Sequence, residues 1–180
     1  CWRGGQRSGS FASILDQVGW RVQLLEGGYR SYRRLVVDTL YHQPLRHRII
    51  LIEGGTGTGK TRLLHHLAEA GEQILDLEGL ANHRGSLFGK QTGGQPSQKM
   101  FETRLAEELA GLDPARLIWI EAESSKVGAR IIPGALWHAM CRAERIEIKS
   151  TLSARARFLA QAYRDLTVNV DRLHHQIDQL

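Results

Sequence analysis

The sequence is poor in cysteine and has no long apolar run. Its 180 residues include only two cysteines, Cys1 and Cys141. So few cysteines, together with the lack of a secretory signal pattern, favour a reducing compartment, and we expect a cytoplasmic protein. A membrane-spanning helix needs about 18 or more consecutive apolar residues. No such run is present, so the sequence predicts no membrane partner.

The composition is that of a globular domain. Hydrophobic residues make up 42% of the chain and charged residues 24%, which excludes a disordered chain. A length of 180 residues allows one ordinary domain, or one domain and a fragment of another. Lysine and arginine outnumber aspartate and glutamate by 24 to 19, for a net charge of +5. This balance favours phosphate-bearing partners without requiring them.

The first forty residues predict a loop, two helices and one strand. Apolar residues at helical spacing indicate one helix over residues 10–18 and another over residues 29–40. Between them, residues 21–25 indicate a short strand that ends at a pair of glycines. A break in the pattern follows at residues 42–44.

From residue 48 onward, strands and helices alternate. The unbroken apolar run at residues 49–52 is typical of a parallel strand buried on both faces. Further strands are predicted at residues 74–77, 117–120 and 146–148, and helices at residues 61–70, 98–110 and 133–142. This alternation predicts an α/β fold with a parallel, helix-covered sheet.

Two stretches outside this alternation also carry a prediction. The polar, glycine-rich stretch at residues 82–97 is long for a connection, which favours a substrate loop. After Ser150 the pattern is helical, and we expect another helix over residues 167–180.

A glycine-rich motif follows the apolar run at residues 49–52. It satisfies the pattern G-x-x-x-x-G-K-[ST] between a buried strand and a helix, which is the context of a phosphate-binding loop. The motif consists of Gly54, Gly55, Thr56, Gly57, Thr58, Gly59, Lys60 and Thr61. Backbone N–H groups and the helix N-terminus would face an anion, Lys60 would reach the terminal phosphates, and the Thr61 hydroxyl would hold Mg²⁺. We expect a phosphorylated ligand.

Acidic residues follow the strand predicted at residues 117–120. Glu121 and Glu123 lie at the carboxyl end of a parallel strand, where such sheets bind ligands. We expect Glu121, which directly follows the apolar run, to complete an Mg²⁺ site with Thr61; a solvated strand end is the alternative. Lys126 and Arg130, further along, are candidates for neutralising a diphosphate.

The sequence begins with a second glycine-rich loop. Cys1 is followed by paired glycines and by Arg3 and Arg7, just before a predicted helix. Amide N–H groups directed at the sulfur, with both arginines nearby, would favour a thiolate and stabilise a persulfide or perselenide. The predicted chemistry is transfer of sulfur or selenium, with these three residues catalytic; an inert thiol is the alternative. Cys141 lies in an apolar helical segment, and we expect it to pack in the core.

These motifs, taken together, resemble known families. The segment CWRGGQRS, with LEGGY after it, resembles the closing third of a rhodanese domain, whose active-site loop begins with a persulfide-carrying cysteine. With the phosphate-binding loop, HRGSLFG at residues 83–89 and ESSKVG at residues 123–128, the chain resembles the bacterial tRNA 2-selenouridine synthase family. The resemblance implies the C-terminal part of a rhodanese-like domain at residues 1–43 and a P-loop NTPase-like parallel α/β domain at residues 44–180.

The resemblance implies an enzyme that modifies tRNA. It would replace sulfur by selenium in the wobble 2-thiouridine, with selenophosphate as donor, through an S-geranyl intermediate made from geranyl diphosphate. Cys1 would carry the chalcogen and residues 54–61 would bind the diphosphate, with no tightly bound cofactor and Mg²⁺ as the candidate ion. The substrate-facing loop would contain His83, Arg84, Ser86 and Phe88. The expected partners are the tRNA and an enzyme that supplies selenophosphate.

The chain begins at Cys1 rather than Met, and we expect it to be a piece of a longer protein. Basic residues between the two predicted modules would track tRNA phosphates or form a solvated helix face. They are Arg30, Arg33, Arg34, Arg46, His47 and Arg48.

A small P-loop kinase or ATPase, or a non-catalytic RNA-binding module, remains open as an alternative function.

Overall fold

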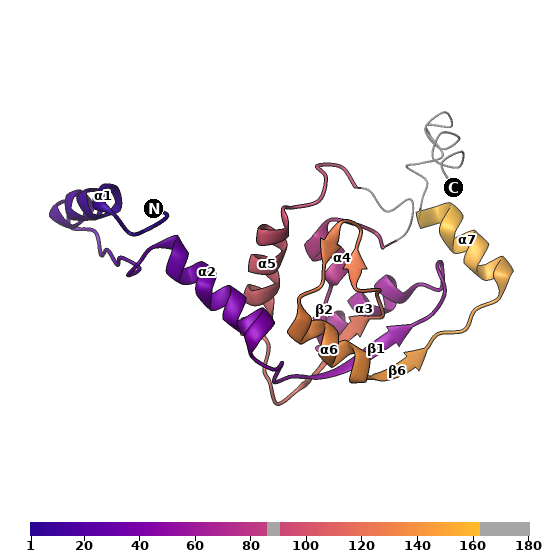
Figure 1. Ribbon diagram of the computed structural model, residues 1–180. Helices are drawn as coiled ribbons and strands as arrows, with labels where there is room; N and C mark the ends of the chain where they lie inside the picture. The colour runs from indigo at the N-terminus through magenta and orange to yellow at the C-terminus, as the bar shows by residue number, and fades with distance from the viewer. Residues whose placement is uncertain (86–90, 163–180) are drawn as a thin grey trace.

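A four-stranded parallel sheet forms the centre of the fold (Figure 1). The computed structural model describes residues 1–85 and 91–162. In spatial order the strands are β2 (Gln73–Leu75), β3 (Leu117–Glu121), β1 (Arg48–Glu53) and β6 (Glu144–Glu147). All neighbouring strands in this sheet run parallel. The predicted α/β fold with a parallel sheet is therefore confirmed.

The inner strands β1 and β3 have the most apolar sequences. They pair in parallel, with Ile50 opposite Trp119. Ile52, Ile118 and Ile120 are fully buried, as expected for strands covered on both faces. β6, with the sequence ERIE, is exposed along its length and forms an edge of the sheet. The apolar run that precedes the phosphate-binding motif thus becomes an inner strand.

Helices follow β1; the first four pack around the sheet, and the last lies against the glycine-rich loop. They are α3 (Lys60–Glu69), α4 (Leu77–Ala81), α5 (Gln98–Gly111), α6 (Gly134–Arg142) and α7 (Leu152–Ala162). Phe101 and Leu105 of α5 and Leu136 and Met140 of α6 share one buried core with Ile120 of β3. This core holds the strands in register, so that their carboxyl ends form a fixed edge.

An N-terminal arm precedes β1 and extends away from the sheet (Figure 1). It consists of α1 (Gln6–Gln17), an irregular segment, α2 (Tyr29–Val37) and a π-helical turn, η1 (Asp38–His42). Buried Glu102 of α5 pairs with Arg33 of α2 and accepts a 2.7 Å hydrogen bond from Tyr41 Oη of η1. The arm is therefore joined to the sheet domain through α2 and η1, whereas α1 stands apart from the sheet.

The strand predicted at residues 21–25 is wrong. This segment is irregular and almost entirely exposed. A strand forms only where a neighbouring strand pairs with its backbone N–H and C=O groups. Among the described residues, none of the strands lies beside this segment, so its local sequence preference is not realised.

The strand predicted at residues 74–77 ends earlier than expected. It ends at Leu75, because Asp76 begins a helix that the sequence did not indicate. The Asp76 Oδ1 atom accepts a 2.7 Å hydrogen bond from Gly79 N and caps α4. α4 therefore starts directly at the carboxyl end of the sheet, ahead of the loop expected at residues 82–97.

Three other elements differ from the prediction in smaller ways. The last strand of the sheet begins at Glu144, before the predicted residues 146–148. A short antiparallel hairpin, β4 (Lys126–Val127) and β5 (Arg130–Ile131), was not predicted, since two-residue strands give no periodic signal. The helix expected at residues 167–180 lies outside the described residues.

The prediction that Cys141 packs in the core is also wrong. Its side chain is exposed. Leu136 and Met140, one helical turn apart, are the buried residues of α6. Successive residues of a helix are separated by about 100°, so the position after Met140 faces away from the core.

Candidate functional site

The glycine-rich loop turns sharply between β1 and α3. Gly57 and Gly59 have φ values of +83° and +84°, a left-handed conformation that glycine adopts without steric cost. Thr58 Oγ1 donates a 2.8 Å hydrogen bond to Gly55 O and closes the turn. Lys60 Nζ donates a 2.8 Å hydrogen bond to Gly54 O, so the lysine folds back along its own loop. Its ammonium group thus lies beside the loop rather than in solvent.

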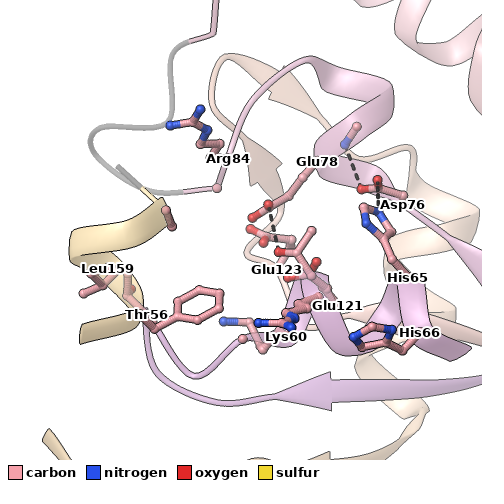
Figure 2. Close-up of a pocket in the computed structure, with 18 of the residues that line it drawn as sticks. Thr56, Lys60, His65, His66, Asp76, Glu78, Arg84, Glu121, Glu123 and Leu159 are labelled. Carbon is pink, nitrogen blue, oxygen red and sulfur yellow. Dashed lines mark hydrogen bonds and ion pairs between the residues drawn. The ribbon is translucent and has the colours of Figure 1, made fainter. Parts of the chain in front are cut away.

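A pocket of about 660 Å³ opens beside this loop (Figure 2). The first turn of α3, with Lys60 and Thr61, lines it together with Glu121 at the carboxyl end of β3 and Asp76 after β2. α4 and α7 form its walls, and from α7 the pocket is lined by Phe158 and Leu159. The position is the one expected for a ligand site of a parallel α/β sheet, outside the carboxyl ends of the strands.

Three carboxylates meet in this pocket. Glu121 ends β3, Glu123 follows it, and Glu78 comes from α4; one oxygen of each lies within 4.8 Å of the other two. Figure 2 shows them facing one another, with a hydrogen bond between Glu78 and Glu123. Glu121 is only 3% exposed, and its Oε1 has no hydrogen-bond partner among the described residues. Thr61 Oγ1 lies 3.5 Å from Glu78 Oε2.

The carboxylates of this cluster hold protons more tightly than ordinary glutamates. Burial, followed by the charge of Glu123, raises the pKa of Glu78 to about 8. Burial, followed by the charge of Glu78, raises the pKa of Glu121 to about 7. Burial also raises the pKa of Glu123. The nearby Lys60 opposes these shifts but does not cancel them. Near neutral pH the cluster must therefore share protons or hold a cation.

A histidine–aspartate pair lies on the α3 side of the same pocket. His65 Nε2 is 3.0 Å from Asp76 Oδ2, and both residues line the pocket. Asp76 is oriented in turn by the N–H of Gly79. This pair can exchange or hold a proton beside the carboxylate cluster.

The pocket also contains Glu78, His65 and Asp76, which were not predicted from the sequence. Their signal was present in part, because Asp76 lies within the strand predicted at residues 74–77 and Glu78 directly follows it. Since the carboxyl ends of neighbouring parallel strands meet at one edge of the sheet, these acids could have been grouped with Glu121. His65 had no such signal, because only the packing of α3 beside β2 brings it to Asp76.

The predicted substrate-facing loop is described in part. His83 is buried, and its Nδ1 accepts a hydrogen bond from Gly85 N at 3.1 Å. Arg84 lines the pocket (Figure 2). Ser86 and Phe88 lie outside the described residues. The structure therefore brings Arg84 to the pocket, while His83 does not line it and accepts a hydrogen bond within the turn.

Lys126 and Arg130 do not reach this pocket. They lie on the β4–β5 hairpin, and neither is among the residues that line the pocket. The predicted acidic residues Glu121 and Glu123 therefore line the pocket, whereas the two predicted cations do not.

The N-terminal loop is built around a close contact of Gly4 with Gly27 and Gly28. Cys1 O accepts a 3.0 Å hydrogen bond from Tyr29 N, at the start of α2. Gly28 has a φ of +62°, and a Cβ on it would lie 2.4 Å from Gly4 N. No side chain fits there without displacing the backbone. The loop is therefore held against the beginning of α2.

Cys1 lies at the edge of a separate hollow of about 500 Å³. The hollow is lined by Cys1, Trp2, Arg3, Gly5, Gln6 and Arg7. The Cys1 thiol is exposed, and α1 begins at Gln6, so the loop does precede a helix as predicted. The structure brings Cys1, Arg3 and Arg7 together at one hollow.

The two predicted loops are not brought together. In Figure 1 the N-terminal loop lies at the far end of the arm, and the turn between β1 and α3 lies near α7 at the opposite end. None of the residues at the Cys1 hollow lines the phosphate-loop pocket. The described residues therefore form two separate hollows. Over the described ranges, no helix is long and apolar enough to cross a bilayer.

Comparison with known proteins gives consistent similarities. The family described as "tRNA 2-selenouridine synthase AAA domain" matches residues 47–178. A tRNA 2-selenouridine synthase of Aeromonas salmonicida is 38% identical over 165 residues, which are 91% of this chain and 43% of that protein. One from Nitrosomonas europaea is 34% identical over 166 residues, again 91% of this chain and 43% of the relative. The chain thus spans less than half the length of these relatives.

Proposed function

Because the chain belongs to the tRNA 2-selenouridine synthase AAA domain family, we propose that it provides the phosphate-binding site of an enzyme that replaces sulfur by selenium in tRNA. The modified base is the 2-thiouridine at the wobble position. Selenophosphate supplies selenium, and geranyl diphosphate supplies the group of an S-geranyl intermediate. On this proposal residues 1–43 belong to a rhodanese-like unit and residues 44–180 to the P-loop domain.

The observation that carries this proposal is the geometry of the glycine-rich loop. Lys60 and the first turn of α3 line a pocket of about 660 Å³ together with the strand ends. Backbone N–H groups at a helix N-terminus and a lysine beside them are the elements that bind a diphosphate. A transfer that breaks the bond between the geranyl carbon and the diphosphate oxygen leaves negative charge on the diphosphate. Lys60 and the helix N-terminus stabilise that leaving group.

The carboxylate cluster fits a hard divalent cation. Three carboxylates and the Thr61 hydroxyl offer only oxygen ligands, as Mg²⁺ prefers. The buried, unpartnered Oε1 of Glu121 gives the same indication. Glu78, Glu121, Glu123 and Thr61 would hold the ion, which would supply positive charge to the diphosphate. Without it, the three acids would repel an incoming phosphate unless they are protonated.

The Cys1 hollow serves the selenium or sulfur step on this proposal. Arg3 and Arg7 stand beside the exposed thiol, and cations near a thiol favour the thiolate. Figure 1 shows the two sites at opposite ends of the folded molecule. On this proposal, therefore, the two partial reactions take place in separate sites. The tRNA base visits them in turn, or the arm moves.

The test is product analysis. The protein is incubated with 2-thiouridine tRNA, selenophosphate and geranyl diphosphate, and the nucleosides are identified by mass spectrometry. The proposal expects S-geranyl-2-thiouridine and 2-selenouridine. ATP turnover that survives Cys1→Ala, with 2-thiouridine unchanged, would instead indicate a P-loop kinase or ATPase. Tight tRNA binding with no new nucleoside would indicate an RNA-binding module.

A further inference from the structure

Helix α7 lies against three of the loop's four glycines. A Cβ on Gly55 would lie 3.0 Å from Nη2 of Arg155, and one on Gly57 would lie 2.8 Å from Cγ of Leu159. A Cβ on Gly59 would lie 3.7 Å from Phe158. The glycines therefore give the loop its curvature and also leave room for α7. This contact joins residues that lie about a hundred positions apart in the sequence.

Arg155 is placed directly on the loop. Its Nε donates a 2.8 Å hydrogen bond to Thr56 O, and its guanidinium plane lies over Gly55. The side chain comes from the first turns of α7, where Thr151 accepts a 3.3 Å hydrogen bond from Ala154 N and caps the helix. The guanidinium has further N–H donors in a rigid fork beyond the one given to Thr56. These donors lie beside the phosphate-binding loop.

Lys60 and Arg155 are held in the same way. Each donates to a carbonyl of the loop, Lys60 to Gly54 O and Arg155 to Thr56 O, both at 2.8 Å. A neutral carbonyl is a weaker partner for a cation than a phosphate oxygen. Both cations can therefore exchange a loop carbonyl for an anionic ligand with a small movement.

Lys60, Arg62 and Arg84 line the pocket, whereas Arg155 lies against the loop outside that lining. Opposite the loop stand Glu78, Glu121 and Glu123, which are partly or fully buried. A diphosphate that enters between them and the loop brings further negative charge, and from the loop itself only Lys60 supplies a cationic side chain. Arg155 adds a positive charge on the side of the loop that faces α7.

We propose that Arg155 is a second phosphate-binding residue of this site, which α7 supplies to the loop. The inference deepens the proposed function and rests on it. When a diphosphate is present, the Arg155 fork leaves Thr56 O and donates to the phosphate oxygens, alongside Lys60. Arg155 then fixes the position of the diphosphate, which sets the direction in which the bond to the leaving group breaks.

The test uses inorganic pyrophosphate and titration calorimetry. Arg155→Ala should weaken pyrophosphate binding by about tenfold to a hundredfold, the usual range for a lost hydrogen bond to a charged group. Arg155→Lys should recover part of the affinity. The matched control is Arg157→Ala, because Arg157 is exposed on the same helix and, unlike Arg155, makes no hydrogen bond to the loop among the described residues; it should change the affinity less than about twofold.

A second control separates binding from helix stability. Thr151→Ala removes the cap of α7 without removing a charge from the pocket, and should lower the melting temperature while pyrophosphate affinity stays nearly constant. If Thr151→Ala weakens binding as much as Arg155→Ala, Arg155 only anchors α7 and the inference is overturned. Equal affinity of Arg155→Ala and the unaltered protein overturns it too.

Lys60→Ala distinguishes this failure from failure of the proposed function. If Lys60→Ala weakens pyrophosphate binding but Arg155→Ala leaves the affinity unchanged, only the inference about Arg155 fails. If the unaltered protein does not bind pyrophosphate, or Lys60→Ala binds it equally well, the loop is not a diphosphate site and both proposals fail.

Discussion

Lys60 is hydrogen-bonded to Gly54, the residue that opens its own loop, with Nζ 2.8 Å from the carbonyl oxygen. The lysine therefore closes the loop on itself until an anion replaces the carbonyl. Cys1, in the N-terminal loop, has a comparable attachment, because its carbonyl oxygen accepts a hydrogen bond from Tyr29 N. Each predicted loop is thus fixed locally, which makes their roles separable by mutation.

Lys60→Ala should weaken pyrophosphate binding by about tenfold to a hundredfold, because a charge-assisted hydrogen bond is lost. It should leave persulfide formation at Cys1 unchanged. Calorimetry measures the first property, and mass spectrometry after treatment with a sulfur donor measures the second. Cys1→Ser should have the opposite pattern. If both substitutions abolish the same partial reaction, the two sites do not act separately.

The stability of the protein should fall as the pH rises from about 5 to about 8. The pKa of Glu78 is raised from 4.5 to about 8 and that of Glu121 to about 7. Between these values the native state binds more protons than the unfolded chain, so increasing pH favours unfolding. Melting temperatures measured across this range, without divalent ions, should show the decline. Glu78→Gln should reduce it, and an identical decline in that variant would contradict the assignment.

Mg²⁺ should reverse this loss of stability at pH 8. A cation that binds the three carboxylates stabilises the native state by about 2.7 kcal/mol at a hundred times its dissociation constant. Glu121→Gln should abolish the Mg²⁺-dependent rise in melting temperature. Glu147→Gln, on the exposed edge strand β6, is the control and should keep it. A Mg²⁺ effect of the same size in Glu121→Gln would exclude the cluster as the binding site.

Gly28→Ala should disturb the Cys1 loop alone. Its φ of +62° and the 2.4 Å approach to Gly4 N leave no room for a methyl group, and the strained backbone should cost more than about 1 kcal/mol. Persulfide formation at Cys1 should slow, while pyrophosphate affinity stays constant. Gly9→Ala is the control, because a Cβ there meets no atom within 4 Å and lies inside α1. Equal effects of both substitutions would show that the Gly4–Gly28 contact is unimportant.

The parallel sheet and the phosphate-binding loop were predictable because their signals are local. The apolar run before Gly54 specifies an inner strand, and the motif after it specifies the turn. Glu78 and Arg155 were not recognised, because their place in the pocket depends on contacts between distant segments. The helix cap at Asp76 creates α4 and brings Glu78 to the strand ends. α7 reaches the loop only after the chain has completed β6.

The errors in the N-terminal part have a related cause. Residues 21–25 have the composition of a strand, but strand formation depends on a neighbour that the local sequence does not specify. Cys141 lies in an apolar helix, yet its angular position relative to Leu136 and Met140 turns it outward. In both cases the prediction relied on the residue types of the segment, whereas the structure depends on how the segment is placed relative to its neighbours.

The contact of α7 with the glycine-rich loop limits what can be learned from the loop's own glycines. A methyl group at Gly57 would strain a left-handed backbone and also collide with Leu159. Loss of activity in such a variant would mix two defects, a misshapen anion cradle and a dislodged helix. Only side chains that extend into the pocket, such as those of Lys60 and Thr61, report on ligand recognition without that ambiguity.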